Sequence, residues 1–153
     1  DRVHDGPKIQ GCSYRVPKPP VSPGTKVPEA DEVIIGEVRV KTVITYPATG
    51  ISHVAGTPLS LRGHAWCGKG PVKAMHLSVD FGATWVPALL AEPRNPFAWQ
   101  RWEASVSFPM PGHYEVWARA TDHQFRMQPM IAPGWNPRGY LNNAMHRIAI
   151  SVT

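Results

Sequence analysis

The chain has 153 residues, of which 42% are hydrophobic, and its formal net charge at pH 7 is +5. This length suits one globular domain with a core of its own and room for a tail. No apolar run approaches the roughly 18 residues of a membrane span, and the basic residues form no run or stripe of the kind that binds nucleic acid.

Residues 1–35 are expected to form a Pro-rich arm or linker. Its prolines are Pro7, Pro17, Pro19, Pro20, Pro23 and Pro28. Proline donates no backbone hydrogen bond and disfavours helix at the residue before it, so the arm should be extended and irregular. The chain opens at Asp1 with neither an initiator Met nor a signal peptide, which is typical of a fragment or a processed chain.

From residue 36 onward, apolar and polar residues alternate, and this period predicts β-strands. The expected strands cover residues 38–46, 59–67, 75–80, 84–86, 102–108, 114–121 and 146–152. Glycine- and proline-containing turns separate them, and no segment has the period of an amphipathic helix. About seven short strands with this spacing predict an all-β, immunoglobulin-like sandwich, without the cysteine and tryptophan framework of antibody domains.

One connection in this sandwich is unusually long. Between Asp122 and Ala144, about twenty residues carry no strand pattern, and loops of that length are usually functional or disordered. This loop contains Trp135, Tyr140 and Arg138, and it is too aromatic for a disordered segment. We therefore expect an ordered, functional loop.

Five sequence blocks resemble, in order, the dimerisation domain of the sulfite oxidase family of molybdenum-cofactor oxidoreductases. The blocks are Leu61–Trp66, Val79–Trp85, Trp99–Glu103, Tyr114–Asp122 and Trp135–Arg147. The similarity runs from about Val40 to the end of the chain and extends to bacterial sulfite and sulfane dehydrogenases. It implies an immunoglobulin-like (E-set) β-sandwich for residues 36–153, with the arm of residues 1–35 following a molybdopterin domain that is missing from this chain.

The resemblance also implies how such a domain works. The upstream domain holds the molybdopterin and performs the chemistry, so this chain is expected to bind no cofactor or metal and to supply no catalytic residue. It should pair with a second copy of itself and border the substrate entrance for sulfite or a related sulfur oxyanion. A heme protein such as a c-type cytochrome would accept the electrons, and the bacterial relatives imply a periplasmic location.

The resemblance assigns one substrate-binding residue, Arg138, which matches the arginine of the family's Trp-Asn-x-Arg-Gly motif. A guanidinium is always charged, and its planar fork of donors suits an oxyanion. Trp135, Asn136, Gly139 and His146 are expected to support the loop around it. The alternative is a structural arginine that binds loop carbonyl groups.

Other polar residues have simpler interpretations. Cys12 and Cys67 are expected to be free thiols, and His64 lies on the opposite strand face from Cys67, so the two cannot easily share a metal. Asp80 lies in a turn, where its side chain should accept a backbone hydrogen bond. Four arginines suit surface or interface ion pairs: Arg62, Arg101, Arg119 and Arg126.

The outward-facing tryptophans leave a second function open. Alternation places Trp66 and Trp117 on outer sheet faces, where they suit a dimer interface or packing against the cofactor domain. They could instead form a carbohydrate platform on a free-standing immunoglobulin-like binding module. The loop around Arg138 favours the oxidoreductase domain, because a sugar-binding sandwich does not need such a loop.

Overall fold

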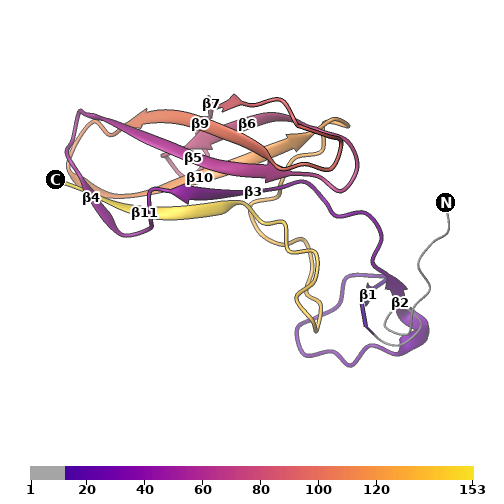
Figure 1. The fold of residues 1–153 in the computed structure, drawn as a ribbon. Helices are drawn as coiled ribbons and strands as arrows, with labels where there is room; N and C mark the ends of the chain where they lie inside the picture. Colours follow the sequence, from indigo (N-terminus) through magenta and orange to yellow (C-terminus); the bar gives the residue numbers. More distant parts are fainter. Residues whose placement is uncertain (1–12) are drawn as a thin grey trace.

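The computed structural model describes residues 13–153, which form a two-sheet β-sandwich with a small hairpin beside one end of it (Figure 1). The elements in chain order are β1 (Arg15–Pro17), a 3₁₀ helix η1 (Glu29–Asp31), β2 (Glu32–Ile34), β3 (Lys41–Tyr46), β4 (Ile51–His53), β5 (Pro58–Trp66), β6 (Val72–Ser78), β7 (Val86–Pro87), β8 (Leu89–Leu90), β9 (Gln100–Ser107), β10 (Gly112–Asp122) and β11 (His146–Val152). No helix among these elements is long and apolar enough to cross a membrane.

The sandwich pairs a sheet of order β3-β5-β9-β8 with a sheet of order β4-β11-β10-β6-β7. The first two strands of the sandwich, β3 and β4, lie in different sheets, so the chain crosses from one sheet to the other between Tyr46 and Ile51. β4 runs parallel to β11, whereas the other pairs in both sheets are antiparallel. This arrangement confirms the predicted all-β, immunoglobulin-like sandwich.

The core lies between the two sheets, where the predicted alternation is confirmed. On β5, Leu59, Leu61, Gly63 and Ala65 are buried, while Ser60, Arg62 and His64 alternate with them on the outer face. Trp102 on β9 is the largest core side chain, at 1% exposure, and its indole Nε1 donates a 2.8 Å hydrogen bond to the Thr42 hydroxyl. The bond satisfies the polar atom of a buried ring that would otherwise lose its hydration.

The arm is more ordered than the sequence predicted. Instead of an irregular linker, its described part forms an antiparallel hairpin in which Arg15–Pro17 pairs with Glu32–Ile34. The short strands β4 and β8 were also missed, because two or three residues are too few to display a period of two. The predicted first strand begins at Lys41 rather than Val38, which is 43% exposed.

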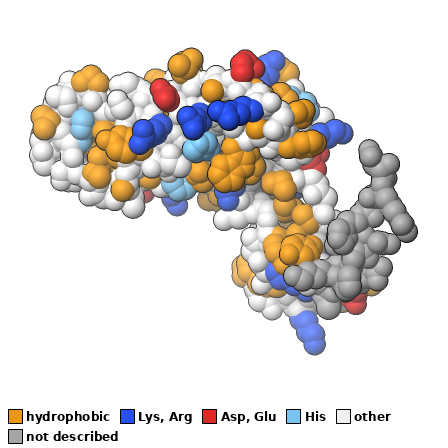
Figure 2. Space-filling view, in the orientation of Figure 1, with side chains coloured by type: hydrophobic (Ala, Val, Ile, Leu, Met, Phe, Trp, Pro, Cys, Tyr) orange, Lys and Arg blue, Asp and Glu red, His pale blue; other side chains and the backbone are white. Residues whose placement is uncertain are grey.

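The two outer faces of the sandwich differ in how their aromatic residues are covered. Trp117 lies on an outer sheet face, as the alternation predicted, but its own neighbours cover the ring and its exposure is only 5%. Phe81 meets its ring edge-on and the Arg147 guanidinium lies 5.7 Å from its centroid. Next to the other sheet, Trp99, which directly precedes β9, is 62% exposed. Figure 2 shows one face of the sandwich, on which hydrophobic and charged side chains lie among one another.

Asp80 organises the turn after β6 as the sequence predicted. Its carboxylate accepts hydrogen bonds from the Ser78 hydroxyl at 2.7 Å, the Thr84 hydroxyl at 2.5 Å and the Thr84 backbone N–H at 2.9 Å. Phe81 and Gly82 follow with φ of 57° and 85°, so Phe81 adopts a left-handed conformation that usually favours glycine. The bonds to Asp80 help to hold that turn.

These bonds make the stability of the turn pH-dependent. Hydrogen bonds from Ser78 and then Thr84 lower the pKa of Asp80 from 3.8 to about 2. Because the folded pKa is depressed, the stabilisation is fully present above pH 4 and is lost as pH falls towards 2. We expect an NMR titration of the Asp80 carboxyl to show this, and Ser78→Ala to raise its pKa. A carboxyl that titrates near pH 4 in the folded protein would contradict the bond network.

Candidate functional site: the joint between the arm and the long loop

The base of the long loop, residues 123–145, is fixed to the end of β10. The Asp122 carboxylate accepts backbone N–H bonds from Gln124 and Arg126, both at 2.9 Å, and pairs with Arg126 Nε at 2.7 Å. Burial raises the pKa of Asp122, but its hydrogen bonds with Arg126 and Gln124 outweigh that effect and the pKa is lowered. Arg126 also reaches Glu37 at 3.0 Å, which confirms its expected role in ion pairs.

Gln128 joins the two legs of the loop, and nothing in the sequence pattern pointed to it. It is 2% exposed, and it exchanges bonds with β10: its backbone N–H donates to the Ala120 carbonyl and its Oε1 accepts from the Ala120 N–H. Its Nε2 donates to the carbonyls of Asn143 and Ala144 on the returning leg. The legs are therefore held together before the tip begins.

The tip of the loop is built around Asn136, one of the residues predicted to support it. Its Oδ1 accepts from the backbone N–H groups of Arg138 and Tyr140, at 3.2 and 3.0 Å, and its Nδ2 donates to the Tyr140 carbonyl at 2.8 Å. Gly139 has φ of +66°, a conformation that glycine adopts without a steric penalty. These contacts fix the backbone on either side of Arg138.

Arg138 reaches from the loop tip to the arm. Its Nη1 contacts both oxygens of the Glu32 carboxylate, at 3.1 and 3.3 Å, and the Arg15 carbonyl at 3.4 Å. The Glu32 side chain is 4% exposed and that of Arg138 33% exposed. Nε and Nη2 form no hydrogen bond within residues 13–153, so two sides of the guanidinium keep free donors.

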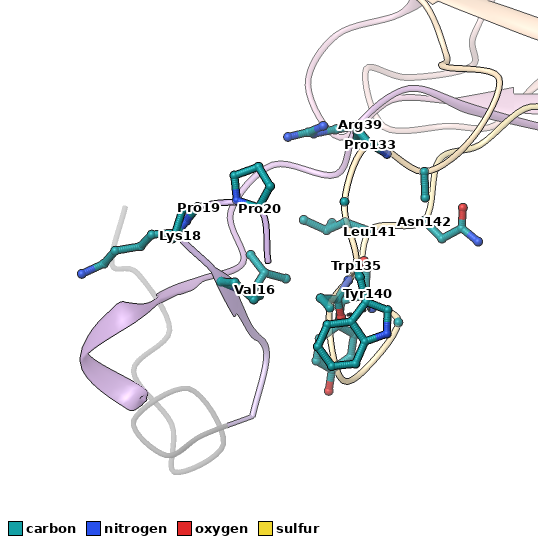
Figure 3. A pocket seen from close by; sticks show the side chains of 15 residues that line it. Val16, Lys18, Pro19, Pro20, Arg39, Pro133, Trp135, Tyr140, Leu141 and Asn142 are labelled. Carbon is teal, nitrogen blue, oxygen red and sulfur yellow. Dashed lines mark hydrogen bonds between the residues drawn. The ribbon is translucent and has the colours of Figure 1, made fainter. Parts of the chain in front are cut away.

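A groove of about 420 Å³ separates the arm from the loop. Figure 3 shows Val16 and Pro20 on the arm side and Tyr140 and Leu141 on the loop side. Arg138 does not line this groove. Its cationic lining residues are Lys18 and Arg39, which the sequence did not single out because neither lies in a recognisable motif.

Further contacts hold the arm against the loop across more than 100 residues of sequence. Tyr14 stacks on Tyr140 with ring centroids 5.6 Å apart, and the backbone of Val21 forms an isolated β-bridge with Trp135, another residue predicted to support the loop. On the sandwich side, Lys41 Nζ donates to the Asn142 carbonyl at 2.7 Å. The arm and the loop therefore form one joint at one end of the sandwich.

His146 lies at the start of β11, where the loop ends. Its Nδ1 accepts a 3.2 Å bond from the Ile44 N–H at the irregularity of β3. Burial, with Lys41 nearby, lowers its pKa, which favours the neutral ring that this acceptor role requires. The side chain thus links β11 to β3 across the two sheets rather than contacting the tip around Arg138.

The described residues do not fit a molybdenum cofactor. Residues 13–153 contain no group of three or more His, Cys, Asp and Glu side chains that could hold a metal ion. Cys67, the cysteine in this range, is buried at 6% exposure and forms no disulfide there, whereas Cys12 lies outside the described residues.

Asn136→Ala is expected to loosen the loop tip without unfolding the sandwich. It removes three hydrogen bonds around Arg138, at about 1 kcal/mol each. Faster hydrogen exchange at residues 136–140, with unchanged exchange in β5 and β10, would show this. Asn142→Ala is the matched control, because within residues 13–153 the Asn142 side chain accepts only the Ala144 N–H bond. Equal exchange in the two variants would refute the central role of Asn136.

A family model and the sequence relatives agree on one family. The family model described as Mo-co oxidoreductase dimerisation domain matches residues 32–153. Chicken sulfite oxidase (Gallus gallus) is 36% identical over 119 residues, covering 74% of this chain and 26% of the relative. Human mitochondrial sulfite oxidase is 35% identical over 127 residues, covering 78% and 23%. The chain thus spans about a quarter of the length of these relatives.

A solved structure supports the fold. The sulfane dehydrogenase SoxCD from Paracoccus pantotrophus matches with a TM-score of 0.61 and 22% identity, and the match covers 88% of this chain and 34% of that chain. At this identity the likeness concerns the fold alone. The family model begins at Glu32, the residue that meets Arg138, so the matched region includes both partners of that ion pair.

Proposed function

This chain belongs to the Mo-co oxidoreductase dimerisation domain family, and from this premise we propose that it is the pairing and substrate-entrance domain of a molybdenum-cofactor oxidoreductase. The substrate would be sulfite or a related sulfur oxyanion. The chain would contribute a binding residue and a subunit contact, while the redox chemistry would take place on molybdopterin in a separate domain.

The observation that carries this proposal is the guanidinium of Arg138. Glu32 fixes it through Nη1 alone, and the side chain is partly exposed with Nε and Nη2 free of hydrogen bonds within the described residues. A preoriented, incompletely used guanidinium can still bind an oxyanion through two donors. Arg138 therefore combines a structural contact with the arm, rather than with loop carbonyl groups, with capacity for substrate, and Trp135, Asn136 and Gly139 would hold its loop.

The proposal requires three partners. A second copy of the chain would pair with it, a molybdopterin domain would lie against the arm and the loop, and a c-type cytochrome would accept electrons. The groove beside the loop, with Lys18 and Arg39 in its lining, is a suitable contact for that cofactor domain. A periplasmic location would suit such an enzyme.

The alternative, a free-standing carbohydrate-binding module, has lost part of its support. It relied on Trp66 and Trp117 as exposed platforms, yet Trp117 is covered by its neighbours, and Trp66 stacks on Trp99 with centroids 5.0 Å apart. A sugar platform needs an open ring face on which the pyranose can lie. In the stacked pair of Trp66 and Trp99, Trp99 is the more exposed ring and Trp66 is partly covered by it.

Native purification from the source cells tests the proposal. We expect molybdenum to accompany the chain in a fixed ratio, together with sulfite-dependent reduction of an electron acceptor. The recombinant 153-residue chain, as the control, should contain neither molybdenum nor this activity. A native preparation of the chain without molybdenum would overturn the proposal, as would sulfite oxidation by the pure recombinant chain.

A further inference from the structure

The outer face of the β3-β5-β9-β8 sheet carries charges and rings that its own chain does not satisfy. Its principal side chains are Tyr46, Arg62, Trp66, Trp99, Arg101 and Glu103, called here the aromatic face. Arg101 and Glu103 form no ion pair with any residue from 13 to 153. Arg62 lies over the Tyr46 ring, with its Cζ 4.9 Å from the centroid, but it too lacks an acidic partner in that range.

The outer face of the opposite sheet pairs its acidic group, Glu115, within the chain, although Arg119 Nε and His76 Nδ1 are buried there without a hydrogen-bond partner among residues 13–153. Arg147 pairs with Glu115 at 3.6 Å, and the Trp117 Nε1 donates to the same carboxylate at 2.8 Å. The Arg119 guanidinium stacks on Trp85, with its Cζ 3.9 Å from the ring centroid. Of the two faces, only the aromatic face therefore presents unpaired charges of both signs beside an exposed ring.

The aromatic face also has a projection and a hollow of its own. Trp99, 62% exposed, stands on Trp66 at one end of β5, with ring planes 20° apart. Towards the other end lies a hollow of about 390 Å³, whose lining includes Arg62, Leu89 and Glu103. Arg62 and Trp66 are four residues apart on β5, about 13 Å along the strand.

We propose that the aromatic face is the surface through which two copies of this chain pair. The assignment rests on the self-association in the proposed function and says where it occurs. A two-fold contact joins the same patch on both copies, so the patch must be complementary to itself. A patch of one sign would repel its twin, whereas Arg101 and Glu103 supply both signs two residues apart on β9.

The register of the sheet makes the pairing specific. Gly63 on β5 lies opposite Trp102 on β9, at the middle of the aromatic face. A two-fold axis that crosses both strands there brings Arg101 of each copy opposite Glu103 of the other. The same rotation carries the Trp66–Trp99 pair of each copy over the hollow of the other, where an aromatic anchor fills a pocket.

Sedimentation analysis of the 153-residue chain and its charge-swap variants tests the assignment. Glu103→Arg and Arg101→Glu should each weaken self-association at least about tenfold, because each places like charges in contact. The double variant Arg101→Glu with Glu103→Arg should restore it. Trp99→Ala should weaken it by a similar factor. Glu29→Arg in η1 is the matched control, since it makes the same charge change away from this face.

The outcomes distinguish two claims: that the chain self-associates, and that it does so through the aromatic face. A wild-type dimer that responds to the aromatic-face variants, while Glu29→Arg is unchanged, supports the assignment. A dimer that tolerates Trp99→Ala and both charge swaps overturns the assignment but leaves self-association intact. A wild-type chain that stays monomeric at the highest accessible concentration overturns both. Circular dichroism of each variant shows that the sandwich is folded.

Discussion

Replacing Arg138 with methionine in the assembled enzyme is expected to raise the apparent KM for sulfite by about 5- to 150-fold. Methionine keeps most of the side-chain length but removes every donor and the charge. Losing charged hydrogen bonds to an oxyanion costs about 1–3 kcal/mol, which corresponds to this range. Because the chemistry would occur on another domain, kcat should change less than KM. Steady-state kinetics over a range of sulfite concentrations measures both.

The control for this prediction comes from the other side of the ion pair. Glu32→Gln weakens the same link between loop and arm but leaves the guanidinium in place. If Arg138 binds the oxyanion, the KM should rise strongly in Arg138→Met and much less in Glu32→Gln. An equal rise in the two variants would mean that the arm, and not the guanidinium, controls binding. Unchanged kinetics in Arg138→Met would remove it from the substrate site.

Gly63→Ala is expected to destabilise the sandwich by about 3 kcal/mol or more, and to lower Tm by about 6–12 °C. A Cβ on Gly63 would overlap the Val43 carbonyl oxygen and the indole ring of Trp102. Neither can give way easily, because one is strand backbone and the other is buried and hydrogen-bonded to Thr42. Thermal and urea unfolding of the purified chain would measure the loss.

Gly36→Ala is the matched control for the core. A Cβ there meets no atom within 4 Å, and the φ of Gly36 is not in the left-handed region. Such a substitution usually stabilises a protein by less than about 1 kcal/mol, because it restricts the unfolded chain. If Gly63→Ala were as mild as Gly36→Ala, the close packing of Trp102 over β5 would be refuted.

The long strands, which bury one face and expose the other, could be predicted from the sequence. The strands too short to show this alternation could not. Leu59 and Leu61 on β5, and Ile148 and Ile150 on β11, alternate with polar residues because only one side faces the core. β8 has two residues and β4 three, so neither can show a period. The hairpin of the arm was missed because proline content describes backbone preference and not pairing partners.

The site was predicted in part for a similar reason. Arg138 and Asn136 were identified through a family motif, since local spacing is visible in a sequence. Glu32 was not, because it lies 106 residues from Arg138 and only the folded chain brings them together. Gln128 is buried, yet its side-chain amide bonds three backbone groups, one on β10 and two on the returning leg of the loop, a role that no periodicity reveals. Trp117 was assigned the correct face, but the side chains that cover it come from other elements.

The joint between arm and loop has a consequence for the order in which the protein folds. The hairpin of β1 and β2 has three residues in each strand, and an isolated two-stranded hairpin of this kind is marginal in water. Its anchors, Tyr140, Trp135 and Arg138, sit on a loop that needs β10 and β11 at its base. We therefore expect the β1–β2 hairpin to order last during folding and to detach first in urea.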